Sequence, residues 1–443
     1  MLLRVISVLV LVAVVAFGGF YAWAWHSEIA PVRPVDASTY DPAIVAKGAA
    51  LASIGSCVVC HTQAGGQAYA GGYPVETPFG TLYGSNITPD PDTGIGSWSQ
   101  AAFRRAMHDG VDRKGQHLYP AFPYDHFTHA ADTDIDAIYS YLMTRDPVQQ
   151  QNREPALAFP LNIRLAAAGW QLLYLRRGEF KPDTAQNAAW NRGAYLAESL
   201  GHCGACHTPR NALGAEKKNE AYNGGIAENW HAPALNGNST AAAPWTAEAA
   251  FQYLRTGWDA HHGHASGPMT AVIDGLAKAP ESDVRALATY IASLSGTDDE
   301  AKSRRADAAL KAAREKTPAI VSLASLQATT GKSGNTNDGA AIFVGACASC
   351  HRSGSQTPSA RPVDLGLSDA INSPDPGNLL QIILSGIHPQ ARERGFIMPG
   401  FSTALTDAQI VALAGYVRTH FSDKPQWTGI DARLTEARRK TGS

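Results

Sequence analysis

The feature that most constrains this chain is a five-residue motif, Cys-x-x-Cys-His, which occurs three times. Each copy has the pattern of an attachment site for a c-type haem. Two thiols at this spacing can add to the two vinyl groups of one porphyrin, and the adjacent imidazole can bind the iron. The candidate thioether residues are Cys57, Cys60, Cys203, Cys206, Cys347 and Cys350, and the candidate iron ligands are His61, His207 and His351.

Zinc sites and redox dithiols also use Cys-x-x-Cys pairs. A closed zinc site needs a second pair of ligands nearby, and a thioredoxin-like dithiol lies in a β-α-β pattern. The sequence offers neither context. The three motifs use all six cysteines of the 443-residue chain, so no thiol remains for a disulfide or another metal site. The motifs therefore predict three covalently bound haem c groups.

The motifs recur at nearly constant spacing, because their first cysteines are 146 and 144 residues apart. Such a period indicates a repeated structural segment. A short predicted helix with a glycine precedes each motif, and a later helix of each segment carries an aromatic residue. We expect the glycine to let these two helices cross closely. The pairs expected to meet are Gly48 and Tyr141, Gly193 and Tyr290, and Gly339 and Tyr416.

Residues 5–25 carry no charge and are long enough to span a bilayer as a helix. Arg4 precedes this segment, so the positive-inside rule places the N-terminus in the cytoplasm and the rest of the chain outside. A cleaved signal peptide is the alternative. The long apolar run and the bulky Trp23 and Trp25 favour a retained anchor. We therefore expect a single-pass protein of the bacterial inner membrane, with its haem domains in the periplasm.

Strand signals are weak, so the predicted fold is mainly α, with three tandem domains after one transmembrane helix. The connector includes the apolar run Trp170–Leu175, for which packing between the first two domains is favoured over a surface that docks a partner or touches the membrane. The predicted segments are an anchor at 1–30, a first domain at 42–148, a connector at 149–184, a second domain at 185–297, a solvated helical linker at 298–334, a third domain at 335–423 and a C-terminal tail at 424–443.

The sixth iron ligand is usually a Met thioether or a second His. Met269 lies 62 residues after His207, and Met398 lies 47 residues after His351. Both stand beside a proline in polar loops, so we interpret them as axial ligands. Met143 continues a helical apolar run and is interpreted as core filling.

The first domain breaks this pattern, because Phe122 stands where the other domains have Met. His126 is the favoured ligand, which would make this haem bis-His and give it the lowest reduction potential of the three. Met107, another histidine (His108, His117 or His129) or an open iron are the alternatives. In the second domain His261, His262 and His264 are expected to be solvated loop residues, with an axial ligand as the alternative less favoured than Met269. A backbone carbonyl of Thr208–Arg210 is expected to accept from the His207 ring.

Composition and motifs also limit which classes of function the chain can have. A net charge of −2 argues against nucleic-acid binding, which would require a basic face. The chain has no dinucleotide fingerprint and no phosphate-binding loop. We therefore expect an electron carrier without substrate chemistry of its own. An enzyme acting on a small ligand at an open first haem, and a quinol-to-cytochrome relay without a dehydrogenase, are the alternatives.

The whole chain resembles the membrane-bound triheme cytochrome c subunits of bacterial periplasmic dehydrogenases, which contain class I cytochrome c domains. Three haem motifs at this spacing carry the resemblance, together with the signatures Trp190–Leu196, Gly201–Asn211 and Leu118–Ala121. Alcohol dehydrogenase subunits usually have Met at the position of Phe122. The segment Phe122–Phe127 looks more like the cytochrome subunit that accompanies molybdenum hydroxylases.

This resemblance implies a catalytic partner and an electron acceptor. The partner would hold molybdopterin and iron–sulfur centres and oxidise a nicotinate- or aldehyde-type substrate. Electrons would pass through the three haems to ubiquinone or to a terminal oxidase. A quinoprotein alcohol dehydrogenase or a flavoprotein sugar dehydrogenase is the alternative partner.

Overall fold

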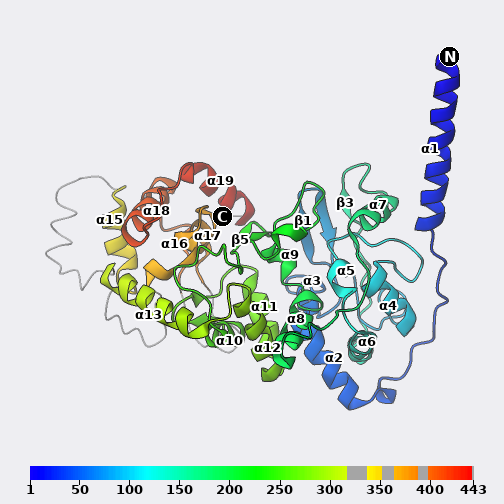
Figure 1. The fold of residues 1–443 in the computed structure, drawn as a ribbon, viewed down its shortest axis with the longest axis horizontal. Helices are drawn as coiled ribbons and strands as arrows, with labels where there is room; N and C mark the ends of the chain where they lie inside the picture. The colour runs from blue at the N-terminus through cyan, green and yellow to red at the C-terminus, as the bar shows by residue number, and fades with distance from the viewer. Residues whose placement is uncertain (317–336, 352–363, 388–397, 442–443) are drawn as a thin grey trace. The chain divides into compact units, whose positions relative to one another are not determined.

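The computed structural model describes residues 1–316, 337–351, 364–387 and 398–441, and its regular structure is mainly helical. The chain divides into two compact units. Unit 1 comprises Met1–Lys181 and Glu198–His202, and unit 2 comprises Pro182–Ala197 and Cys203–Ser443. Figure 1 shows the elements of both units. The predicted preponderance of helix is confirmed.

Unit 1 begins with a long apolar helix, α1 (Leu2–Ala24), whose side chains are almost all exposed. Within the described ranges, α1 is the helix long and apolar enough to cross a membrane. The remaining helices of this unit are η1 (Ala37–Thr39), α2 (Pro42–Ile54), α3 (Cys57–Cys60), α4 (Gln100–Asp109), α5 (Tyr124–Phe127), α6 (Asp132–Met143) and α7 (Leu165–Tyr174). Its strands are β1 (Pro74–Thr77), β2 (Gly80–Tyr83) and β3 (Ala156–Leu157).

Helices α2 and α6 form the central crossing of unit 1. Asp41 caps α2, because its carboxylate accepts from the backbone N–H of Ala43, and Pro42 occupies the first turn, where no N–H is needed. At Gly48 the two backbones touch. A Cβ added there would lie 1.9 Å from the Ala137 carbonyl oxygen and 2.9 Å from the Tyr141 Cβ. The predicted crossing of Gly48 and Tyr141 is confirmed.

The segment after α1 is attached to unit 1 by backbone hydrogen bonds. Its backbone is fixed to unit 1, since Ile29 N–H donates to the Arg113 carbonyl at 2.9 Å and Val32 N–H donates to the Ser97 carbonyl at 3.0 Å. Gly115 has a φ of +84°, and a Cβ there would lie 2.1 Å from the His26 carbonyl oxygen. The end of α1 is therefore held at a defined place on this unit.

The connector expected at 149–184 is also part of unit 1 over most of its length. Helix α7 buries Ala167, Ala168 and Gln171 against this unit. Gln171 Nε2 donates to the Gly110 carbonyl at 3.0 Å, and Trp170 packs edge-on against Tyr124. Packing of this run between the first two domains was the favoured interpretation, and these contacts place one face of the helix against unit 1 itself.

Unit 2 repeats the glycine crossing twice. In the first pair, α8 (Ala188–Glu198) meets α12 (Glu281–Ser293), and a Cβ on Gly193 would lie 1.9 Å from the Ala286 carbonyl oxygen. In the second, α15 (Gly339–Ile342) meets α18 (Asp407–Phe421), and a Cβ on Gly339 would lie 2.2 Å from the Ala412 carbonyl oxygen. The predicted aromatics, Tyr290 and Tyr416, lie at these crossings.

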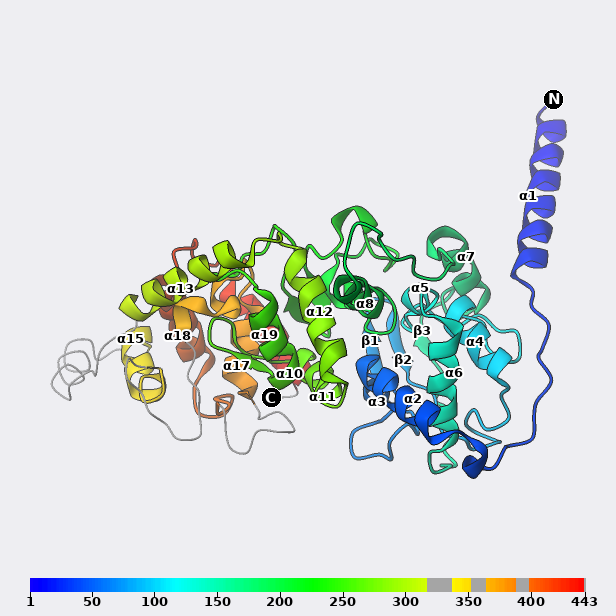
Figure 2. The same ribbon diagram turned by 60° about the horizontal axis from the view of Figure 1, so that its bottom comes forward.

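Other elements of unit 2 surround the two crossings. Short strand pairs, which sequence patterns did not reveal, accompany the helices. Figure 2 shows α8 and α12 of this unit from a second direction. The helices are α9 (Gly204–His207), η2 (Lys218–Glu220), α10 (Ala247–Thr256), α11 (Met269–Leu276), α13 (Asp299–Lys316), η3 (Phe343–Cys347), η4 (Leu365–Leu367), α16 (Asp369–Asn372), α17 (Gly377–Ser385) and α19 (Ile430–Thr441). The strands are β4 (Gly225–Ala227), β5 (Trp230–Ala232), β6 (Trp258–Asp259) and β7 (Gly263–His264).

The C-terminal segment, expected as a tail, folds onto the third crossing. Helix α19 buries Ile430 and Leu434 in the same apolar core as α17 and α18. Trp427 closes this core, and its indole N–H donates to the Ser373 carbonyl at 2.9 Å. The segment after residue 423 is therefore packed against α17 and α18 over the residues that form this core.

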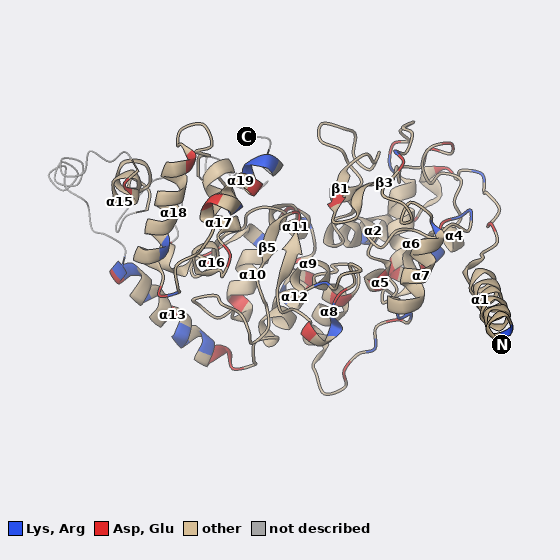
Figure 3. Ribbon diagram, turned by 90° about the horizontal axis from the view of Figure 1, so that it is seen from above, with Lys and Arg blue, Asp and Glu red and all other residues tan. Residues whose placement is uncertain are grey.

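The linker expected at 298–334 contains helix α13 over its described part. As predicted, this part is helical, and it carries both basic and acidic residues (Figure 3). However, α13 also has a buried face, which carries Lys302, Ala306 and Ala313. The Lys302 ammonium donates to the carbonyls of Ala292 and Gly296, each at 2.5 Å. Lys302 thereby satisfies carbonyls at the end of α12, which fixes α13 to the second crossing.

Replacing Lys302 tests this attachment. We expect Lys302→Ala to lower the free energy of unfolding of unit 2 by about 2 kcal/mol, because it leaves buried carbonyls without their charged donor. Lys311→Ala is the matched control, since Lys311 is exposed on the same helix. Chemical unfolding followed by circular dichroism measures both. Equal effects of the two substitutions would show that the Lys302 contacts do not stabilise the unit.

Candidate haem sites

The first haem motif lies against a β-hairpin. Strands β1 and β2 pair antiparallel, with Val75 opposite Leu82. Gly84 follows the hairpin so closely that a Cβ there would lie 1.7 Å from the Cys60 carbonyl oxygen. The next residue, Ser85, accepts a hydrogen bond from Nδ1 of His61 at 2.7 Å. A neutral imidazole that donates through Nδ1 carries its lone pair on Nε2, the nitrogen then available to iron.

The second motif has the same arrangement. Strands β4 and β5 form a hairpin in which a Cβ on Gly225 would lie 2.4 Å from the Cys206 carbonyl oxygen. Nδ1 of His207 donates to the Pro233 carbonyl at 2.8 Å. The expectation that a carbonyl of Thr208–Arg210 would accept this bond was therefore wrong. The acceptor comes from the hairpin because the hairpin, and not the residues after His207, lies beside the ring.

Burial favours the protonation state that binds iron. It lowers the pKa of both His61 and His207, although the hydrogen bonds to Ser85 and Pro233 oppose the shift. Both rings are thus held neutral, as a metal-ligating imidazole must be. Burial also raises the pKa of the Cys57 thiol to about 12 and that of the Cys347 thiol to about 11. Because thiolates are the reactive form, we expect haem attachment to precede closure of these sites.

Met269 lies on the loop that faces the second hairpin. It is the first residue of α11 and follows Gly267 and Pro268. Gly267 has a φ of +59°, and a Cβ there would lie 2.4 Å from the Trp230 ring. Trp230 is on β5, the strand whose continuation supplies Pro233. One hairpin therefore contacts both the His207 ring and the residues that directly precede Met269.

The third motif is partly outside the described residues. Cys347, Cys350 and His351 are described and half-buried, whereas residues 352–363 and 388–397 are not described. Met398 is half-buried and forms a bridge in which its N–H donates to the Ile387 carbonyl at 3.0 Å, and Ile387 N–H donates back to Met398. Met398 is thus held at the end of α17, inside the third domain.

In the first domain, the structure keeps His126 as a candidate ligand. His126 is 2 % exposed on α5, and its Nδ1 donates to the Glu198 carbonyl at 3.1 Å. That bond places the lone pair of a neutral ring on Nε2, as in His61. Phe122 is half-buried and packs against Tyr124 and Phe127. Phe122 therefore belongs to an aromatic group with two residues of α5.

Two of the alternative ligands for the first haem, His108 and His117, use both ring nitrogens in polar contacts with the protein. Both nitrogens of His108 make polar contacts, to the Thr128 carbonyl at 3.3 Å and to Asp132 at 2.9 Å. Both nitrogens of His117 do so as well, to Gln171 at 2.6 Å and to the Ala24 carbonyl at 2.7 Å. Neither ring has a nitrogen left for iron in this arrangement. Met107 and Met143 are both buried, on α4 and α6.

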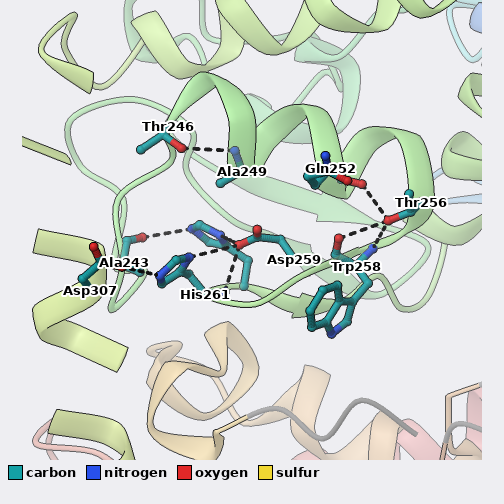
Figure 4. A network of polar contacts seen from close by, with 10 residues as sticks. Ala243, Thr246, Ala249, Gln252, Thr256, Trp258, Asp259, His261 and Asp307 are labelled. Carbon is teal, nitrogen blue, oxygen red and sulfur yellow. Dashed lines mark hydrogen bonds and ion pairs between the residues drawn. The ribbon is translucent and has the colours of Figure 1, made fainter. Parts of the chain in front are cut away.

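The histidine cluster near Met269 is a polar network instead of a solvated loop (Figure 4). His262 is buried, stacks on Trp245 and donates from Nδ1 to Asp259 at 2.8 Å. His261 contacts Asp307 of α13 at 3.3 Å. Burial would raise the pKa of Asp259, but hydrogen bonds from His262 and the His261 backbone lower it overall. The expectation of solvated residues was wrong for His262, because Asp259 compensates its burial.

Helices that cross at a glycine beside a Cys-x-x-Cys-His motif, with the motif imidazole oriented by a backbone carbonyl, define a c-type cytochrome. The cytochrome c family model matches residues 45–146 and 182–295. The model of the cbb3-type cytochrome c oxidase subunit III matches residues 334–417. The cytochrome c domains imply covalently bound haem c, and the paired Cys and oriented His residues suit that group.

Known relatives define the family more closely. A nicotinate dehydrogenase subunit of Pseudomonas putida is 44% identical over 95% of this chain, although the chain spans only 34% of that protein. The fructose dehydrogenase cytochrome subunit of Gluconobacter japonicus is 34% identical, with 91% of this chain and 84% of the relative covered. The cytochrome c subunit of the quinone alcohol dehydrogenase of Gluconacetobacter polyoxogenes is 32% identical, with 90% and 85% covered.

The chain belongs to the family of cytochrome c subunits of dehydrogenases. The family resemblance predicted from the three motifs and their spacing is thereby confirmed. The chain spans about a third of the nicotinate dehydrogenase relative and most of the length of the fructose and alcohol dehydrogenase relatives. An electron-transfer role follows from membership of this family.

Proposed function

We propose that the chain carries three haem c groups and transfers electrons from a dehydrogenase catalytic subunit to ubiquinone or a terminal oxidase. The observation that carries this proposal is the glycine crossing repeated beside each of the three motifs, at Gly48, Gly193 and Gly339. The domains are class I cytochrome c domains at 42–148, 185–297 and 335–423, the last extended by α19. The chain itself performs no substrate chemistry.

The proposed ligand set follows the motifs. Thioethers form at Cys57 and Cys60, at Cys203 and Cys206, and at Cys347 and Cys350. His61, His207 and His351 bind the three irons on one side, and His126, Met269 and Met398 bind them on the other. When bound, the haems supply one-electron chemistry, and the protein sets their potentials through the axial ligands.

Electron exchange between the second and third haems is supported by contacts within unit 2. The Asn378 side chain on α17 accepts from the His231 N–H and donates to its carbonyl, both at 2.8 Å. Gln381 donates to the Asn229 carbonyl at 3.0 Å. These bonds join the hairpin that orients His207 to the helix that leads to Met398. Two domains held this way keep a fixed distance between their cofactors.

The catalytic partner is proposed to hold molybdopterin and iron–sulfur centres. The support is the 44% identity to a nicotinate dehydrogenase subunit and the Phe122–Phe127 segment. The coverage of the fructose and quinone alcohol dehydrogenase subunits favours a flavoprotein or quinoprotein partner as the second candidate. Helix α1 is proposed to anchor the chain in the inner membrane, with the haem domains in the periplasm.

Gentle purification of the tagged chain from native membranes tests the partner. Co-purifying molybdopterin and iron–sulfur subunits are the expected result. A flavoprotein or quinoprotein in their place would establish the second candidate. A chain that purifies without any partner would overturn the assignment to a dehydrogenase complex and favour the free relay.

The ligand of the first haem is tested by His126→Ala. We expect the variant to lose one low-spin haem and to bind carbon monoxide at that haem when reduced, because the sixth position is vacated. His129→Ala is the control, since His129 follows the same helix and its Nδ1 donates to the Gly178 carbonyl. Absorption spectra and a redox titration measure both variants. Unchanged spin states and potentials in His126→Ala would exclude His126 and leave Met107, His129 or an open iron, and a change in His129→Ala alone would identify His129.

A further inference from the structure

Helix α7 exposes large apolar side chains that a helix on the surface of a water-soluble domain normally buries. Its buried side carries the small or polar residues Ala167, Ala168 and Gln171. Trp170 packs inward against Tyr124, but two leucines point outward, since Leu172 is 52% exposed and Leu173 is 55% exposed. Surface helices normally bury their apolar stripe, so an exposed one indicates an apolar partner.

The exposed apolar surface is larger than these two leucines. A compact turn precedes α7, in which the Leu161 N–H donates to the Ala158 carbonyl and the Ile163 N–H donates to the Pro160 carbonyl. Gly169 lies on the outward side of α7, and a Cβ there would meet no atom within 4 Å. The α7 apolar face is defined by the exposed residues Phe159, Leu161, Ile163, Leu172 and Leu173.

This face lies beside the end of the proposed membrane helix. His117 joins the two elements, because its Nε2 contacts the Ala24 carbonyl at the end of α1 and its Nδ1 contacts Gln171 of α7. The segment after α1 is fixed to the same unit at Ile29 and Val32. Figures 1 and 2 both show α7 next to the C-terminal end of α1.

The charges around α7 suit a membrane surface. Between Glu154 and Glu179 the sequence contains no acidic residue. Arg176 is exposed at the end of the helix, and the neighbouring Arg177 is exposed as well, although its Nε donates to Asp109 at 2.6 Å. Apolar side chains followed by basic ones match the order from acyl chains to phosphate headgroups. The apolar run at the exit of α1 continues this pattern with exposed Trp23 and Trp25.

We infer that the α7 apolar face inserts into the outer leaflet of the bilayer that α1 crosses, so that unit 1 has a second membrane contact. The inference rests on the proposed function of α1 as an anchor. The two contacts together would hold the first haem domain in one orientation at the membrane surface. A protein occupant of this face is the competing outcome of the test.

A hydrophobic carbene-generating probe that partitions into acyl chains tests this contact in native membranes. Mass spectrometry then maps the label along the full-length chain. We expect label on α1 and on 159–173, at a level several-fold above that on α2. Helix α2 is the matched control, because its Ile44 is 45% exposed, similar to Leu172, in the same unit. The double variant Leu172→Gln, Leu173→Gln should lose the α7 label while α1 keeps its own.

Label on α1 but not on α7 would overturn the second contact and leave the anchor intact. Absence of label from both helices would overturn the anchor as well. A face that becomes labelled only after the partner subunits are removed would show that a protein covers it, which also overturns the inference. A variant that keeps its α7 label despite both glutamines would show that the leucines do not insert, which overturns the inference too.

Discussion

Met269→Leu is expected to convert the second haem from a low-spin to a high-spin state and to lower its reduction potential by on the order of 100 mV, since a Met thioether raises the potential of haem iron. The variant should also bind carbon monoxide at that haem when reduced. Leu nearly conserves the volume of Met, so the loop around Gly267 and Trp230 should keep its packing. Absorption spectra and a potentiometric titration measure these changes.

Met143→Leu is the control for this substitution. Met143 is 7% exposed within α6 and fills the apolar core of unit 1. The control should leave all three potentials unchanged and alter stability by less than about 1.5 kcal/mol. If Met269→Leu also left the spin state and potentials unchanged, Met269 would not be the ligand, and the hairpin contact through Trp230 would have only a structural role.

Gly193→Ala should lower the free energy of unfolding of unit 2 by about 3 kcal/mol, because the new Cβ has no space at the crossing. It would lie 1.9 Å from the Ala286 carbonyl oxygen and 2.9 Å from the Tyr290 Cβ. Backbone atoms cannot move aside as the end of a side chain can, so α8 and α12 must separate. Denaturant unfolding followed by circular dichroism gives the change.

The control for the crossing is Gly415→Ala on α18. A Cβ on Gly415 would meet no atom within 4 Å, although this glycine also lies within a helix of unit 2. Alanine there should stabilise the unit by about 0.7 kcal/mol, through the lower entropy of the unfolded chain. Loss of stability in both variants, or in neither, would contradict the proposed role of close approach at Gly193.

The crossings were predictable from the sequence because a glycine and an aromatic residue at a fixed distance from a haem motif leave few ways to pack two helices. Gly48, Gly193 and Gly339 all occupy the predicted contacts. The ligand roles of Met269 and Met398 stay predictions, since the structure shows only that Met269 begins α11 and that Met398 forms a bridge with Ile387.

The hairpins that orient His61 and His207 were not predictable in the same way. Their strands are three or four residues long and have no alternating pattern. Their acceptors are the backbone carbonyls of Ser85 and Pro233, which any residue could supply. Glycines after each motif, Gly84 and Gly225, were the available signal, since a backbone that passes so close to a Cys carbonyl excludes a side chain.

The remaining differences between the sequence predictions and the structure come from tertiary contacts. His262 was expected in solvent, but the burial of its ring depends on Asp259 and on stacking with Trp245. The C-terminal segment was expected as a tail, because its charged composition hides the few apolar residues, such as Leu434, that α19 buries. Such contacts depend on distant segments and leave little trace in local sequence.

The ratio of covalently bound haem to protein tests the central claim most directly. We expect three haems per chain, measured by the pyridine haemochrome spectrum and by the mass of the intact chain. The double variant Cys347→Ala, Cys350→Ala should carry two, since it removes the attachment site of the third domain. A ratio of two in the unmodified chain, with no change in the variant, would contradict the proposed function by showing that the third motif binds no haem.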